Sequence, residues 1–158
     1  MLPFNPIPIE VLCGYVCRWM KHNHITIPRV GKLIDLKGQQ LDILRERISF
    51  LKQHYVRGRD LGVVLTRYPI ILDRPWEELY NIIQLLEDAG VRREWIGFVI
   101  CRSPKVLTIS IDELLDKISF FQNLGVTTDQ FGPMAFNFPA SIGHFSLPDM
   151  QKKVQSAQ

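Results

Sequence analysis

The chain has little cysteine, little excess charge and no long apolar run. Its three cysteines are few and odd in number, which argues against a disulfide framework and favours a reducing compartment. Charged residues or prolines interrupt every apolar stretch before the roughly 18 residues that a membrane-spanning helix needs. We therefore expect a water-soluble protein without membrane contact. Its 158 residues, 46% of them apolar and 22% charged, suit one ordinary globular domain.

Charge of one sign is also scarce, since the net charge is only +3. Its distribution is uneven: residues 1–66 carry ten Lys or Arg against five Asp or Glu, and residues 67–158 carry nine against eleven. This mild basic excess is compatible with nucleic-acid contact but is far from that of a histone-like or arm-like segment. Charge alone therefore decides no function.

Motifs of catalysis are missing as well. The sequence has no glycine-rich phosphate loop, no Gly-x-Ser-x-Gly and no His-Glu-x-x-His. Its acidic pairs, such as Glu77 and Glu78, fall in the first turns of expected helices, where they complement the helix dipole. We predict that the protein is not an enzyme and that it requires no cofactor and no small-molecule substrate.

One cluster of possible metal ligands lies near the amino terminus. Cys13, Cys17, His22 and His24 fall within twelve residues, and zinc takes such ligands. Their spacing does not match the usual finger or ribbon patterns, and Trp19 intervenes as if on a helix. We predict a reduced apolar helix here and no metal site.

The strongest pattern is a repeat of 35 residues, marked by Pro69, Pro104 and Pro139. Residues 67–101 overlay 102–136 without a gap. The aligned pairs include Arg67 with Arg102, Leu72 with Leu107, Glu78 with Glu113, Ile83 with Ile118, Gly90 with Gly125 and Gly97 with Gly132. Such self-similarity is typical of stacked units that bury their apolar faces against one another, so we predict a solenoid.

Within each unit the pattern predicts two helices and a tight turn. In the better-formed unit, Ser110 and Glu113 form a capping box before an apolar stripe, and Gly125 ends that helix. Residues 127–129 offer caps for a second helix, which Pro139 ends. In the preceding unit we expect helices over 76–88 and 94–102.

These boundaries divide the chain into two parts. Residues 1–40 do not fit the repeat, although 11–20 could form a helix, and 41–158 form the repeat domain. Its units are 41–66 (partial), 67–101, 102–136 and 137–158 (partial), and in the first of them Tyr55 replaces the expected glycine. Because a solenoid needs about three or more units and polar ends, we expect a segment that is cut from, or closes, a longer array.

The details of the repeat resemble one known family. Arg67-Tyr-Pro-Ile-Ile-Leu72 is followed by a helix and Ala89-Gly-Val91, and Arg102-Ser-Pro-Lys-Val-Leu107 by a helix and Leu124-Gly-Val126. A third copy begins at Asn137-Phe-Pro-Ala-Ser-Ile142. This pattern, over about 41–154, resembles the mitochondrial transcription termination factor (mTERF) family, with a plant organellar member as the nearer relative. Tetratricopeptide and pentatricopeptide repeats fit less well.

The resemblance implies an all-α, right-curved solenoid of about 35-residue units, each with two α-helices and a short 3-10 helix at the Pro-x-x-Leu step. It implies a nucleic-acid partner on a basic concave face, with double-stranded DNA as the first expectation and RNA as the alternative. Organellar gene-expression proteins are further expected partners. The implied role is regulation of transcription, including termination, or of RNA metabolism. The implied location is the chloroplast, with the mitochondrion as the alternative.

Repeated cations are the candidate contacts to phosphate. Arg67 and Arg102 end the second helix of successive units, so stacking would align them, and Lys105 lies beside the second. The alternative role of such a cation is to complement the negative end of the helix dipole. A second cluster of cations lies in the turns between helices. The alternative to phosphate contact there is that the side chains are simply solvated. The predicted nucleic-acid-binding residues are Arg67, Arg102, Lys105, Arg57, Arg59, Arg92 and Arg93.

Other side chains are predicted to be structural. Arg45, Arg47 and Lys52 alternate with acids and predict an ordinary exposed helix face. Cys101 and most phenylalanines are assigned to the core, whereas Trp76 and Trp95 are expected to be partly exposed. The phenylalanines in question are Phe50, Phe98, Phe120, Phe121, Phe131, Phe136 and Phe138.

A second function fits the same repeats. The weak net charge and the acidic carboxy-terminal half are compatible with a protein-interaction scaffold instead of a nucleic-acid-binding protein. The steep salt dependence of phosphate contacts separates the two hypotheses. A third hypothesis is a truncated product without binding of its own, whose mark would be poor folding because of bare apolar helix faces.

Overall fold

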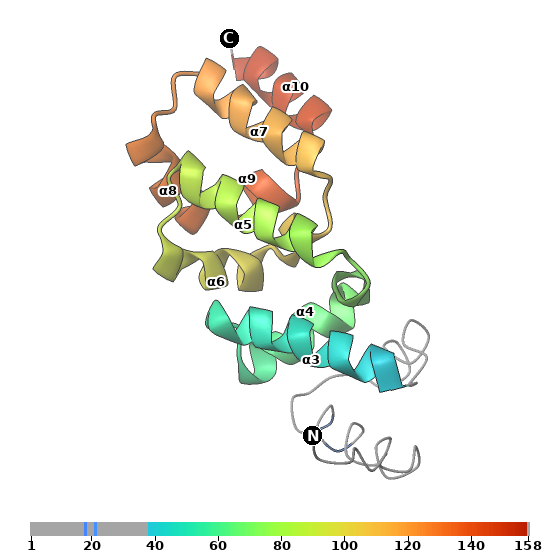
Figure 1. The fold of residues 1–158 in the computed structure, drawn as a ribbon. Helices are drawn as coiled ribbons and strands as arrows, with labels where there is room; N and C mark the ends of the chain where they lie inside the picture. The colour runs from blue at the N-terminus through green and yellow to red at the C-terminus, as the bar shows by residue number, and fades with distance from the viewer. Residues whose placement is uncertain (1–17, 19–20, 22–37, 158) are drawn as a thin grey trace. The chain divides into compact units, whose positions relative to one another are not determined.

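The computed structural model describes Arg18, Lys21 and residues 38–157 (Figure 1). Every regular element of this described part is helical. The chain forms two compact units, one of residues 1–53 and 57–73 and the other of residues 54–56 and 74–158. Most of the helix expected over 11–20, and the cluster of Cys13, Cys17, His22 and His24, lie outside the described residues.

The first unit contains α3 (Gly38–Gln53), α4 (Gly58–Arg67) and the 3-10 helix η1 (Pro69–Leu72). The three elements contact one another in pairs. Its core is made of fully buried apolar side chains at Phe50, Leu51, Leu61, Leu65 and Ile71. The helix η1 begins with a proline, which has no backbone N–H. Because the first amides of a helix have no intrahelical acceptor, proline at this position leaves no backbone donor without a partner.

The second unit repeats this plan. Its elements are α5 (Trp76–Ala89), α6 (Arg93–Arg102), η2 (Pro104–Leu107), α7 (Ile111–Asn123), α8 (Thr128–Asn137), α9 (Ala140–Gly143) and α10 (Leu147–Ala157). The helices expected over 76–88 and 94–102 therefore lie within one residue of their observed bounds. The third Pro-x-x-apolar step differs from the other two, since α9 is a short α-helix in which the His144 amide donates to Ala140.

Helices at the same place in consecutive repeats pack on one another in this unit. In Figure 1, α5, α7 and α10 lie side by side in that order, and contacts join α5 to α7 and α7 to α10. Likewise α6 contacts α8, and η2 contacts α9. The buried face of α5, which includes Leu79, Ile82 and Leu86, belongs to the resulting core. This packing of equivalent helices from successive repeats is the solenoid arrangement that the repeat predicts.

The caps of the helices follow the sequence closely. Ser110 accepts a hydrogen bond from the Glu113 amide at 3.0 Å, and the Thr127 amide donates to the Gln130 side chain at 3.0 Å. The carboxylate of Glu113 lies 3.6 Å from Lys117, so in place of the predicted return bond to Ser110 it faces a cation on its own helix. Thr127 is the residue of the 127–129 segment that precedes the second helix.

The first helices end at residues with positive φ. Gly90 and Gly125 have φ of 121° and 92°, as expected of glycine after a helix. Tyr55, which takes the place of that glycine in the first repeat, has φ of 66°. A residue with a β-carbon in this left-handed region is strained by roughly 1–2 kcal/mol.

Tyr55 gives a direct test of this strain. We expect Tyr55→Gly to have a free energy of unfolding about 1 kcal/mol higher than Tyr55→Ala, because both variants lose the ring and only glycine loses the left-handed penalty. Urea denaturation followed by circular dichroism measures the difference. Equal stabilities would mean that the backbone at position 55 relaxes without cost.

Glycines of the second helices allow close backbone approach. A β-carbon on Gly132 would overlap the carbonyl oxygen of Gly90, and one on Gly97 would overlap the carbonyl oxygen of His54. The two glycines are aligned by the 35-residue repeat. Each lets a second helix pass against the chain that ends a preceding first helix, so the packing distance is set by backbone atoms.

Candidate nucleic-acid interface

Two cations in the second unit are buried and bond to backbone carbonyls. Arg74 Nη1 donates to the Leu107 carbonyl oxygen at 2.7 Å, and its Nε donates to Glu78 at 2.9 Å. Lys117 Nζ donates to the Ile142 carbonyl oxygen at 2.8 Å and lies 3.6 Å from Glu113. Burial lowers the pKa of Lys117, and the Glu113 carboxylate partly offsets this.

We call each set of cation, glutamate and carbonyl a clamp. The glutamates and carbonyls of the two clamps occupy equivalent positions of the 35-residue repeat, whereas the two cations do not. Glu113 and Ile142 lie 35 residues after Glu78 and Leu107. The cation, however, precedes its glutamate by four residues in the first case and follows it by four in the second. Arg74 is replaced by Ile109 one unit later, and Lys117 by Ile82 one unit earlier. Each of the repeats 67–101 and 102–136 therefore holds one cation for a carbonyl of the next repeat, supplied from either side of the glutamate.

Arg47 corrects one prediction from the sequence. It lies two repeats, or 70 residues, before Lys117 and is only 6% exposed, whereas an exposed position was expected. Burial lowers its pKa, and neighbouring Glu46, 3.9 Å away, partly offsets the effect. Arg45 on the same helix is exposed, as expected. Arg47, Arg74 and Lys117 are thus removed from the set of cations that can reach a phosphate.

All seven predicted nucleic-acid-binding residues are exposed. Arg57, Arg59 and Arg67 belong to the first unit, and Arg92, Arg93, Arg102 and Lys105 to the second. The structure describes each group within its own unit, so the alignment of Arg67 with Arg102 stays a prediction. Within the second unit, the four cations lie at the two ends of α6 and at the start of η2.

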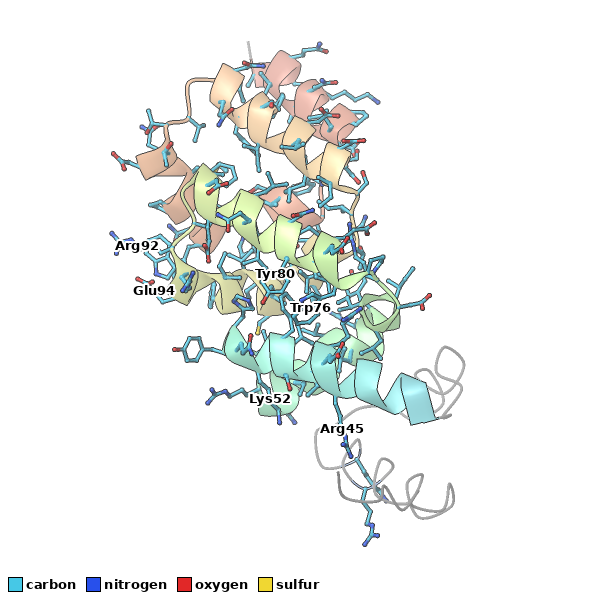
Figure 2. All side chains as sticks on the ribbon, viewed as in Figure 1. Arg45, Lys52, Trp76, Tyr80, Arg92 and Glu94 are labelled. Carbon is cyan, nitrogen blue, oxygen red and sulfur yellow. The ribbon has the colours of Figure 1, made fainter. Side chains whose placement is uncertain are left out.

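The cations at both ends of α6 lie against aromatic rings. The Arg92 guanidinium lies 4.9 Å from the centre of the Trp95 ring, and that of Arg102 lies 5.0 Å from the Phe98 ring. Arg93 instead pairs with Glu87 at 3.3 Å. Figure 2 shows Arg92 and Glu94 projecting outward at the beginning of α6.

The rings continue onto the neighbouring second helix. Phe136 of α8 stacks on Phe98 with centroids 4.4 Å apart, and its centroid lies 5.1 Å from that of Trp95. Phe98 is 37% exposed and Phe138 is 69% exposed, so assigning these two to the core was wrong. Phe50 and Phe131 are buried and Trp76 and Trp95 are partly exposed, as predicted. Cys101 is half-buried and is not a core residue.

Other chemistries find little support in the described residues. No group of three His, Cys, Asp or Glu among them could hold a metal ion. Within Arg18, Lys21 and 38–157, no helix is both long enough and apolar enough to cross a bilayer. The exposed side chains around α6 can make ionic and stacking contacts.

Comparison with known proteins agrees with the packing of the repeats. The profile of the mTERF family matches residues 22–157. The chain belongs to the mTERF family. It is also 38% identical over 129 residues to the protein named transcription termination factor MTERF2, chloroplastic, of Arabidopsis thaliana. That alignment covers 81% of this chain and 20% of the relative, so the chain spans about a fifth of that mTERF protein's length. The mTERF resemblance inferred from the Pro-x-x-Leu and Gly-Val pattern is confirmed.

Proposed function

We propose that this mTERF chain binds nucleic acid and regulates chloroplast gene expression. Double-stranded DNA is the expected target, and RNA is the alternative. Transcription termination is the expected process. The family match and the name of the Arabidopsis relative support the general role and the location. Mitochondrial location is the alternative. No enzymatic step is part of this proposal.

The observation that carries the proposal is the sorting of cations in the structure. Three cations are buried, and two of them, Arg74 and Lys117, bond to a carbonyl of the next repeat. Arg92, Arg102 and Lys105, at the ends of α6 and in η2, are exposed. Arg67 occupies the same place at the end of α4 in its own unit. Each cation that neutralises a phosphate releases counterions, which makes affinity fall steeply with salt.

A double substitution tests the two aligned arginines. We expect Arg67→Ala with Arg102→Ala to weaken duplex binding about tenfold at physiological salt and to reduce the slope of log K against log salt by about 2, one unit for each lost phosphate contact. Fluorescence anisotropy over a salt series measures both quantities. Arg45→Ala with Lys152→Ala removes the same charge from other exposed positions and is the control.

The outcomes separate the site from the function. Equal affinity and slope in the two double variants would reject Arg67 and Arg102 as the phosphate contacts. Absence of binding to DNA and RNA by the folded wild-type chain would favour the second candidate, a protein-interaction scaffold. The exposed Phe138 and the acidic balance of residues 67–158 are the observations that favour that candidate.

A further inference from the structure

One side of α6 carries two aromatic rings flanked by two cations. Arg92, Trp95, Phe98 and Arg102 follow one another at intervals of three, three and four residues, which places them on one face of the helix. The two rings lie between the two guanidinium groups, and Phe136 extends the ring surface onto α8. We call Arg92, Trp95, Phe98, Arg102 and Phe136 the α6 stacking face.

A second helix does not require this chemistry. One repeat later, α8 occupies the corresponding place with Thr127, Gln130, Pro133 and Asn137, which include no cation and no aromatic ring. Both helices keep their buried apolar residues, such as Ile96 and Phe131. Since α8 forms without cations or aromatic rings at these positions, a helix at this place of the repeat does not need them in order to form.

We propose that the α6 stacking face binds the unpaired bases of a single-stranded nucleic acid. This inference rests on the proposed function and specifies the part of the polymer that this surface takes. Aromatic faces stack on bases of any sequence, and flanking cations attract the phosphates. Arg92 and Arg102 are ten residues apart, or about 15 Å along the helix, which matches about four stacked bases at roughly 3.4 Å each.

Charge distinguishes this occupant from a protein. Arg92 and Arg102 lie against the rings, and exposed Arg93 and Lys105 are close to them in the sequence. Of the acids in this stretch, Glu87 is paired with Arg93, and Glu94 is exposed. The surface is therefore complementary to a polyanion with planar groups. An exposed guanidinium holds a ring less strongly than a base does, so a base can replace Arg102 on Phe98 while the guanidinium turns to a phosphate.

A strand without bases gives the decisive test. The wild-type chain is titrated with a short labelled uridine oligonucleotide and with an abasic strand of the same length and charge. We expect the base-bearing strand to bind on the order of tenfold more tightly, because only that strand can stack. Equal affinity for the two strands would leave the proposed function standing and overturn this inference. If the chain binds neither strand and no duplex DNA, both the proposed function and this inference are rejected.

Substitutions at Phe98 locate the effect. We expect Phe98→Leu to lose most of the preference for the base-bearing strand with an unchanged salt slope, because the phosphate contacts remain. Phe98→Tyr keeps an aromatic face and should retain the preference within about twofold. Phe145→Leu is the matched control, since Phe145 is also exposed and has Lys153 over its ring. A preference that survives in Phe98→Leu, or falls equally in Phe145→Leu, would contradict the assignment.

Discussion

Lys117→Ile should lower the free energy of unfolding by about 2 kcal/mol. Isoleucine fills most of the apolar space, so the loss comes mainly from the Ile142 carbonyl oxygen, which keeps no donor in a buried site. Leaving a buried polar group unsatisfied costs about 1–3 kcal/mol. The preceding repeat already has isoleucine at this position, as Ile82, and tolerates it because Arg74 supplies the donor there.

The same reasoning predicts a rescue. Ile109 is the equivalent of Arg74, so Ile109→Arg in the Lys117→Ile background rebuilds the arrangement of the preceding unit around Glu113. We expect this double variant to come within about 1 kcal/mol of wild type. Ile109→Arg alone should destabilise by about 2 kcal/mol or more, because it adds a second buried cation beside Lys117.

Urea denaturation of the four proteins in this cycle measures the coupling between positions 109 and 117. Lys152→Ile, at an exposed position on α10, is the control and should change stability by less than about 0.5 kcal/mol. Additive effects of the two substitutions would show that the two clamps are not equivalent.

Gly132→Ala should destabilise the chain by about 2–3 kcal/mol. In an ordinary helix, alanine is favoured over glycine by up to about 1 kcal/mol, so the expected sign is the reverse of the helix propensity. The reason is that the added β-carbon would overlap the Gly90 carbonyl oxygen, a backbone atom that cannot move aside alone. Relief requires α8 to move away from the end of α5, with loss of packing around Phe131.

Thermal and urea unfolding of Gly132→Ala check this expectation. Pro133→Ala changes the next residue of α8, which is exposed, and should cause no loss of stability. Gly97→Ala should behave like Gly132→Ala, because its β-carbon would overlap the His54 carbonyl oxygen. A stabilised Gly132→Ala variant would show that the crossing of these backbones is loose.

Helix boundaries could be predicted from the sequence because their causes are local. Ser110 caps α7, Gly90 and Gly125 supply positive φ, and Pro104 cannot continue α6. Each cause acts within a few residues, and the repeat presents the glycine and the proline at least twice. The 3-10 form of the third turn was predicted incorrectly, since α9 is α-helical after the same proline step.

The exposure of individual side chains could not be predicted from their neighbours in the sequence. Arg47 follows Glu46 in an ordinary charged pattern, and nothing local shows that it is buried. Phe98 lies beside apolar residues, yet its ring lies at the surface against Phe136, 38 residues away. The alignment by 35 residues held a usable signal, because Arg47 and Lys117 share one position of the repeat. A cation that recurs at one helix position of the repeat, as Arg47 and Lys117 do, indicates a buried cation.

The clamps of Arg74 and Lys117 also bear on how such arrays change in length. Each donor belongs to one unit, and its acceptor is a backbone carbonyl that every unit has, whatever its side chains. The donating residue can therefore change its position within a unit without any matching substitution in the next one. Duplication of the repeat 67–101 or 102–136 would carry its donor and its acceptor carbonyl together. Gene rearrangement in steps of 35 residues is thus compatible with this interface, whereas insertion of a single residue between Glu113 and Lys117 is not.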